Sequence, residues 1–187
     1  MSVISIVYFS ATGTTKSLAE AIAAGAGSGA VLVPIEGKQI VEGRFQDEAL
    51  LAKLSASDAI IFGSPTFMGG VAGQFKAFAD ATAGIWYQRA WAGKLAGGFT
   101  TSGSPSGDKQ GTLQYLMTFG MQHGMLWTSQ NEISGLFAGV PPDQAVNRLG
   151  SYSGVMGQAA PGTPLTAGDL ETGRLYGARI AGFLAKG

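Results

Sequence analysis

VISIVYF at residues 3–9 and SATGTT at residues 10–15 stand near the start of the chain and decide its fold. The first stretch is rich in β-branched and aromatic residues without regular polar alternation, which is typical of a strand buried on both faces of a parallel sheet. The second is small and polar, and apolar residues recur at helical spacing from Leu18 onward. The chain therefore begins with a strand, a polar loop and a helix, which is the repeating unit of a parallel α/β sheet.

The same unit recurs along the rest of the chain. Further strands are expected at 30–35, 58–63 and 94–101, and a fifth is expected to begin at 125–127. Helices are expected from about residue 14 and at 47–54, 72–82, 110–122 and 170–185, with polar loops at 64–70 and 102–107 and an irregular segment at 131–164. This alternation predicts one α/β domain over residues 1–187, with three layers around a doubly wound five-stranded parallel sheet of order 2-1-3-4-5. Ligands of such sheets bind beyond the carboxyl ends of the strands.

The composition excludes several classes of function. Lys and Arg together number 12, as do Asp and Glu, so no strong field favours nucleic acid, an anionic membrane or basic protein partners. Cysteine is absent, which excludes disulfides, thiolate metal ligation and a cysteine nucleophile, and the single histidine excludes a multi-histidine metal site. Neither a signal peptide nor an apolar run long enough for a membrane span is recognised. Together with the balanced charge and the absence of cysteine, this leads us to expect a cytoplasmic protein without membrane or nucleic-acid partners.

The first polar loop carries four hydroxyl side chains directly before the amino terminus of a helix: Ser10, Thr12, Thr14 and Thr15. Free backbone amides and the helix dipole favour an anion at such a position, and Gly13 allows the backbone to approach it closely. The spacing matches neither the phosphate loop of nucleotide hydrolases nor the glycine pattern of dinucleotide-binding proteins. The loop therefore predicts a phosphate site; the alternative is an ordinary strand-to-helix turn capped by threonine.

These motifs carry a resemblance to a known family. The pattern Ser10-x-Thr12-Gly13-x-Thr15 resembles the FMN phosphate loop of flavodoxins. The stretch GSPT at 63–66, with a glycine at 69 and AGQF at 72–75, is similar to the second flavin loop of the flavodoxin-like WrbA-type NAD(P)H:quinone oxidoreductases and NADPH-dependent FMN reductases. The likeness continues at 84–86, 93–96, 100–102, 123–125 and 173–177, so it covers almost the whole chain in order.

The resemblance implies a flavodoxin-like fold, non-covalently bound FMN and three flavin-binding loops. The first loop would hold the FMN phosphate through Ser10, Thr12, Gly13, Thr14 and Thr15. The second would run along the isoalloxazine ring through Pro65, Thr66, Phe67, Met68 and Gly69. The third would wrap the pyrimidine and the ribityl chain through Thr100, Thr101, Ser102 and Gly103. The family sequence P-T-R-F-G-N is PTFMGG here, so an Arg and an Asn are missing and two polar contacts to the flavin are in doubt.

Two further residues receive roles from the resemblance. His123 would face the flavin, sometimes from across the site, and is the candidate catalytic residue; the alternative is a capping contact at a helix end. Trp86 would close the flavin site of a neighbouring subunit, and the alternative is a plain surface or interface anchor. Together with Tyr87 and Trp91 it predicts an aromatic cluster too dense for a monomer surface, so a homodimer or homotetramer is expected.

The reaction that the resemblance implies is two-electron transfer from NADH or NADPH through FMN to a quinone-like small molecule, in which the cofactor supplies the chemistry and the protein supplies position. The sequence does not choose between the two nicotinamide donors. Three alternatives stay open: an NADPH-dependent FMN or azo reductase, a flavodoxin-type electron carrier, and a domain that has lost FMN. The balanced charge favours a reductase over a carrier that docks on basic partners.

Overall fold

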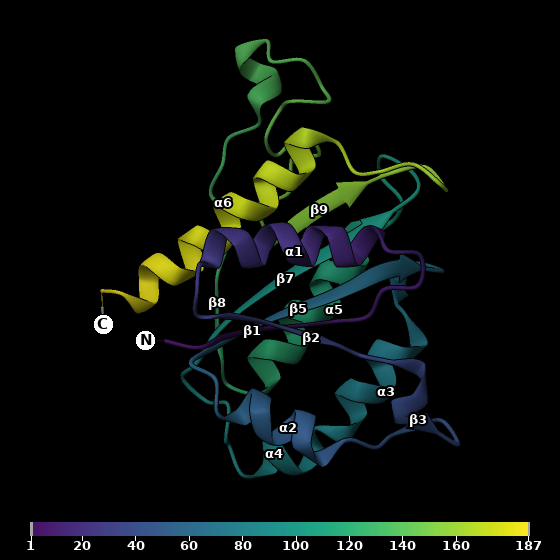
Figure 1. Cartoon of the computed structure of the whole chain (residues 1–187), viewed down its shortest axis with the longest axis vertical. Coiled ribbons are helices and arrows are strands. Elements are labelled where there is room, and N and C mark those ends of the chain that lie inside the picture. The colour runs from purple at the N-terminus through teal and green to yellow at the C-terminus, as the bar shows by residue number, and fades with distance from the viewer. Residues whose placement is uncertain (1, 187) are drawn as a thin grey trace.

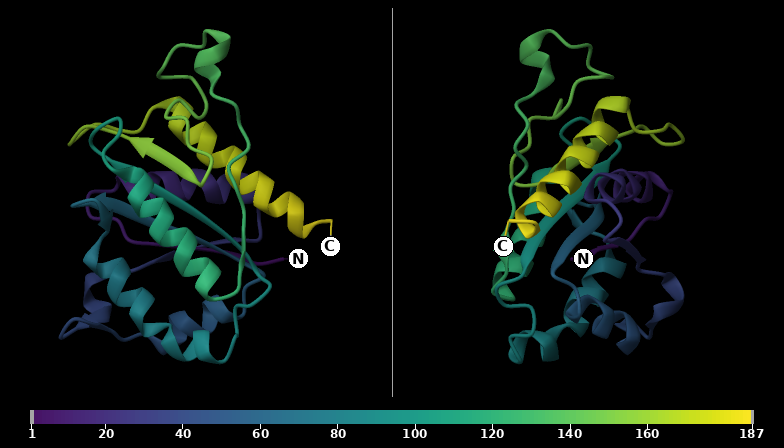
Figure 2. Two further views of the ribbon diagram at one scale, coloured as in Figure 1. Left: turned by 180° about the vertical axis from the view of Figure 1, so that it is seen from behind. Right: turned by 60° about the vertical axis from the view of Figure 1, so that its left-hand side comes forward.

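A parallel sheet lies between two layers of helices in the computed structural model, which describes residues 2–186 (Figure 1). Helices α1 (Thr14–Ala26) and α6 (Ala167–Leu184) cover one face, and α2 (Glu48–Ser55), α3 (Gly73–Ala81) and α5 (Lys109–Gln122) cover the other, with the short α4 (Ala83–Tyr87) after α3. Figure 2 shows the same layers from two other sides. The three-layer architecture is as predicted; residues 1 and 187, the ends of the predicted domain, lie outside the described residues.

The main strands have the predicted order. The central strand β1 (Ile4–Tyr8) pairs in parallel with β2 (Ala30–Pro34) on one side and with β5 (Ala59–Phe67) on the other. Strand β5 then pairs with β7 (Leu95–Ser102), which pairs with β8 (Leu126–Trp127) and β9 (Val155–Gln158). The polar loops after β1, β5 and β7 consequently emerge at one edge of the sheet, the carboxyl edge.

The fifth strand position is shared by two short strands, and part of the prediction for this region was wrong. Strand β8 pairs with the beginning of β7, whereas β9, which lies inside the stretch predicted to be irregular, pairs with the end of β7. The chain between them leaves the sheet and includes the short helix η2 (Gly135–Ala138), which projects at the top of Figure 1. Strand β9 escaped detection because its four residues, VMGQ, contain no apolar run of strand length.

The stretch predicted as a loop at 64–70 is largely a β-hairpin. Strand β5 continues to Phe67 and pairs antiparallel with β6 (Gly70–Val71). The two residues between these strands, Met68 and Gly69, have φ values of 49° and 82°, which is the geometry of a tight type I′ hairpin turn. A second small hairpin, β3 (Ile40–Val41) with β4 (Arg44–Phe45), follows the short helix η1 (Gly37–Gln39) in a region without a clear sequence pattern.

Two apolar cores occupy the two faces of the sheet. One joins α1 and α6 to β1 and includes Leu18, Ile22 and Ile180; the other joins α2, α3 and α5 to the opposite face. Helices α1 and α6 approach at backbone distance, because a Cβ added at Gly177 would lie 1.9 Å from the Ile22 carbonyl oxygen. No helix within residues 2–186 combines the length and the hydropathy needed to cross a membrane.

Candidate functional site

A cavity of about 530 Å³ opens at the carboxyl edge of the sheet, and its volume suits a small-molecule site. Three walls enclose it: the first loop with the start of α1, the end of β5, and the loop after β7 together with the segment that follows β9. The residues that line it are Ala11, Thr12, Gly13, Thr14, Thr15, Ser17, Pro65, Phe67, Thr101, Ser102, Gly103 and residues 159–165. The cavity therefore lies where a doubly wound sheet is expected to bind its ligand.

The first loop is shaped by Ser10. Its Oγ accepts hydrogen bonds from the amides of Gly13 and Lys16, both at 3.2 Å, which folds the loop over the first turn of α1. Gly13, at the N-cap, has a φ of 93°, in the region that favours glycine. Within residues 2–186 the amides of Thr12, Thr14 and Thr15 have no hydrogen-bond partner. These free donors at a helix amino terminus can bind an anion.

A pair of hydroxyls joins the first loop to the third. Thr15 Oγ1 and Thr101 Oγ1 lie 2.8 Å apart, and both side chains also border the cavity. Because one hydroxyl donates to the other, the second keeps its own hydrogen for a ligand oxygen. No lysine or arginine is among the lining residues in the described part of the chain, so an anion here is held by amides, hydroxyls and the helix dipole.

The second wall is apolar and comes from the end of β5. Pro65 and Phe67 face the cavity, and Ser64 braces this turn by accepting from the Ala72 amide and donating to the Pro65 carbonyl, each at 2.9 Å. Phe67 is 47% exposed, so its ring is available to a planar ligand. Met68, at the hairpin tip, is fully exposed.

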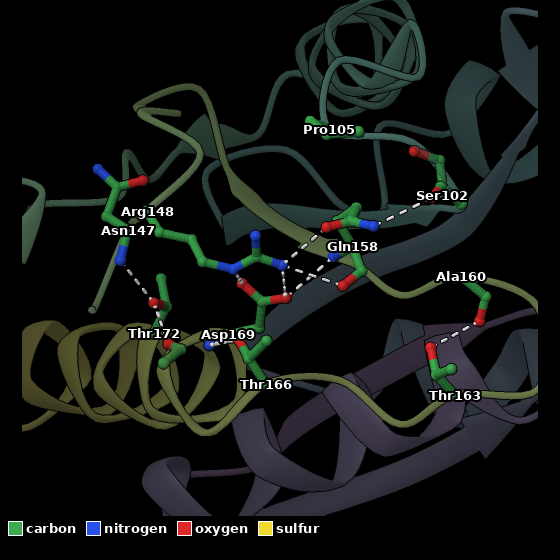
Figure 3. A network of polar contacts seen from close by, with 12 residues as sticks. Ser102, Pro105, Asn147, Arg148, Gln158, Ala160, Thr163, Thr166, Asp169 and Thr172 are labelled. Atoms are coloured by element: carbon green, nitrogen blue, oxygen red, sulfur yellow. Dashed lines mark hydrogen bonds and ion pairs between the residues drawn. The ribbon is translucent and has the colours of Figure 1, made fainter. Parts of the chain in front are cut away.

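The third wall is supported by a polar network that connects the loop after β7 to β9 and α6 (Figure 3). Gln158 donates to the Gly103 carbonyl at 3.0 Å, and Arg148 binds Gln158 on the other side. Arg148 also makes a bidentate ion pair with Asp169, with both N–O distances at 2.8 Å. Asp169 lies in the first turn of α6, which is capped by Thr166. This helix therefore anchors the cavity wall through the side chains of Arg148 and Gln158.

The structure brings most of the predicted flavin residues together at this cavity. Those that line it are Thr12, Gly13, Thr14, Thr15, Pro65, Phe67, Thr101, Ser102 and Gly103. Ser10 shapes the first loop, as described above. Thr66 and Thr100 hydrogen-bond each other at 2.9 Å behind the wall, and neither they nor Met68 and Gly69 line the cavity. The binding of FMN by these residues stays a prediction.

His123 and Trp86 lie away from this cavity, at the opposite edge of the sheet. His123 caps the carboxyl end of α5, is 2% exposed and packs on Trp91, with the ring centroids 4.4 Å apart. The Thr82 hydroxyl donates to the Ala79 carbonyl, so at 3.0 Å it accepts from His123 Nε2–H, which leaves the buried Nδ1 without a hydrogen. Burial lowers the pKa of His123 to about 4, and the ring is neutral.

These contacts give His123 a structural role within its own chain, and a role at the flavin of another copy stays a prediction. Trp86 and Tyr87 are exposed, with ring centroids 6.5 Å apart. The third member of the predicted surface cluster was misplaced, because Trp91 is fully buried in the core and its indole N–H donates to Ser55 Oγ. Sequence alone does not separate a core indole from a surface one.

Sequence reasoning missed one side of the cavity. Residues 159–165 follow β9 and therefore also emerge at the carboxyl edge. Their Pro161-Gly162 turn dipeptide was a usable signal for a loop, but without β9 there was no strand to place it. Ser17, one turn into α1, was missed because the predicted phosphate loop ended at Thr15.

Comparison with known proteins agrees with this geometry. The model of a family described as NADPH-dependent FMN reductase matches residues 6–135. The chain belongs to this family. Its relatives include a protein named Flavodoxin FldP from Pseudomonas aeruginosa, 40% identical over 97% of this chain and 96% of the relative. Another, named NAD(P)H dehydrogenase (quinone), from Archaeoglobus fulgidus, is 32% identical over 97% of this chain and 96% of its own length.

A solved structure of a similar protein has the same fold as this chain. A crystal structure described as a flavodoxin, WrbA-like protein from Agrobacterium tumefaciens superposes with a TM-score of 0.78 at 41% identity, over 100% of this chain and 99% of that one. The flavodoxin-like fold and the WrbA-type resemblance inferred from the sequence are therefore confirmed. The chain is an oxidoreductase of the NADPH-dependent FMN reductase family.

Proposed function

We propose that this family member binds FMN non-covalently in the carboxyl-edge cavity, as one domain, and transfers two electrons from NADH or NADPH to a quinone or a related acceptor. The observation that carries the proposal is the first loop, in which Thr12, Thr14 and Thr15 present free amides at a helix amino terminus. The names of the relatives support the nicotinamide donor and the quinone acceptor.

The cavity fits each part of FMN. The amide cradle suits the phosphate, the hydroxyl pair Thr15–Thr101 suits the phosphate or the ribityl chain, and the apolar wall of Pro65 and Phe67 suits the planar ring. FMN, when bound, supplies the hydride and electron chemistry. The chain orients it, and the segment 159–165 excludes water from one side of the cavity. Phe67 replaces the family Arg here, so the ring meets an apolar side chain instead of a cation.

The decisive experiment compares FMN with riboflavin, which lacks the phosphate. The variant Thr14→Asp places a carboxylate in the first turn of α1, where it favours the helix but repels a phosphate. We expect at least tenfold weaker FMN binding by flavin fluorescence titration, with riboflavin affinity unchanged. Ala49→Asp, in the first turn of α2, is the matched control and should bind FMN like the wild type. Wild-type protein without affinity for FMN, or equal loss of both flavins, would overturn the proposal.

A flavodoxin-type electron carrier is the second candidate, favoured by the name of the relative FldP. Anaerobic addition of NADH or NADPH to the FMN-loaded protein separates the two functions. A reductase loses its yellow colour on mixing and turns over when benzoquinone, an azo dye or free FMN is added, and the best acceptor identifies the subclass. A carrier keeps its colour with both nicotinamides and is reduced only by a partner protein.

A homodimer or homotetramer is part of the same proposal. Its support is the exposed aromatic pair of Trp86 and Tyr87. Light scattering of the wild type and of Trp86→Ala tests it, because the variant should lower the molar mass in solution. A wild-type monomer at all concentrations would contradict the proposed assembly and leave the FMN site unaffected.

A further inference from the structure

A buried lysine stands behind the third wall of the cavity. Lys109 is the first residue of α5, and its side chain is fully buried. Its Nζ donates to Ser102 Oγ at 2.8 Å and to the carbonyls of Ser104 and Pro105 at 2.7 and 3.0 Å. These three bonds use all three hydrogens of an ammonium group, so the amine is charged and fully satisfied by the loop after β7.

Within residues 2–186, no carboxylate forms an ion pair with this charge. The charged groups that act on it are Asp169 on α6, which attracts it, and Arg148, which repels it and already holds that carboxylate. Asp108, the N-cap residue of α5, is exposed to solvent. Burial lowers the pKa of Lys109 to about 8, which leaves the ammonium form dominant at neutral pH.

The charge lies one hydrogen bond from the cavity. Ser102 lines the cavity, and its Oγ accepts one of the three hydrogen bonds of Lys109 Nζ. Since the Ser102 hydroxyl donates its own hydrogen to the Ser104 carbonyl, its oxygen can only accept from a ligand, which matches a ring N–H. The cavity lining itself contains no charged side chain in the described chain. Lys109 is therefore a positive charge set behind an otherwise neutral wall.

We propose that Lys109 is a positioning residue that holds the loop of Ser102, Ser104 and Pro105 in its binding shape and whose charge favours the fully reduced form of the bound flavin. The inference rests on the proposed binding of FMN. Fully reduced flavin carries a negative charge at neutral pH and oxidised flavin carries none. A buried cation lowers the free energy of the charged form relative to the neutral form, because few water molecules screen it. The two-electron midpoint potential is thereby raised.

The experiment measures that potential by titration with reference dyes in four FMN-loaded proteins at pH 7. Lys109→Gln removes the charge and keeps a donor for the loop, Lys109→Met removes both, and Lys53→Met on the exposed surface of α2 is the matched control. We expect both Lys109 variants to disfavour reduction at least tenfold, which is about 30 mV for a two-electron couple. Only Lys109→Met should also weaken the binding of oxidised FMN, and Lys53→Met should match the wild type.

The wild type provides a second measurement if the variants do not fold. Its midpoint potential should fall more steeply with pH above about pH 8, because reduction then draws a proton onto the neutral Lys109 amine. Unchanged potentials in folded Lys109 variants, or a wild-type slope without this break, would overturn the inference and leave the FMN proposal standing. Wild-type protein that binds no FMN would overturn both.

Discussion

Replacement of Arg148 by Met should lower the free energy of unfolding of this protein far more than the same replacement of Arg174. Asp169, the partner of Arg148, is 2% exposed, and Arg148 itself is 12% exposed. Without the guanidinium the carboxylate keeps only the Gln158 amide at 3.0 Å and its place in the first turn of α6. An uncompensated buried charge of this kind typically costs about 3–5 kcal/mol of the free energy of unfolding. A domain of this size has only about 5–15 kcal/mol in total.

Arg174 provides the control on the same helix. Its ion pair with Glu171 is shorter, at 2.6 Å, but both side chains are more than 40% exposed. Solvent screens such a pair, and its removal should leave stability almost unchanged. The comparison therefore separates burial from distance, since the weaker effect is expected for the shorter contact.

Urea denaturation followed by tryptophan fluorescence measures both variants, with the slope m as a check that the unfolded surface is unchanged. The double variant Arg148→Met/Asp169→Leu should regain part of the loss, because no charge is then left unpaired. FMN affinity of Arg148→Met should also fall, since Gln158 and the Gly103 carbonyl lose their support. Equal stability of the Arg148→Met and Arg174→Met proteins would refute the reasoning.

Three further outcomes follow from the structure. The pKa of His123 is about 4 in the folded chain, against an ordinary 6.5. As the pH falls, the unfolded chain binds the proton first, so the free energy of unfolding is fully present above pH 6.5 and falls by about 3 kcal/mol as the pH drops towards 4. The variant His123→Phe should abolish this loss in urea titrations. Met68→Asn should raise the free energy of unfolding by about 1 kcal/mol, and with it the melting temperature, because asparagine tolerates the φ of 49° in this turn. A lower melting temperature would contradict this prediction. Gly177→Ala should cost about 1–3 kcal/mol at the α1–α6 contact, whereas Gly182→Ala, which meets nothing within 4 Å, should be neutral or stabilising by thermal denaturation.

The sequence was most informative where one local pattern sufficed. The apolar opening strand and the hydroxyl-rich turn after it predicted the first strand and the loop that now borders the cavity. The alternation of strand and helix patterns along the chain predicted the parallel sheet and the order of its main strands. The sequence was least informative where a strand was short or where one strand position was shared by two strands. Strand β9 is stabilised by pairing with the end of β7, 50 residues or more away along the chain, and no pattern within VMGQ indicates that partner.

The sequence by itself determined the fold class and the composition of the three polar loops, because strand and helix periodicity and loop chemistry are properties of neighbouring residues. The family was indicated by the resemblance of the chain's motifs to those of a known family. Only the tertiary structure decided which side chains share a space. It placed His123 in the core at the far edge of the sheet, Trp91 beneath the helices and Lys109 behind the cavity wall. Burial and the pKa of a group depend on residues from distant segments, and those distances exist only after the chain has folded.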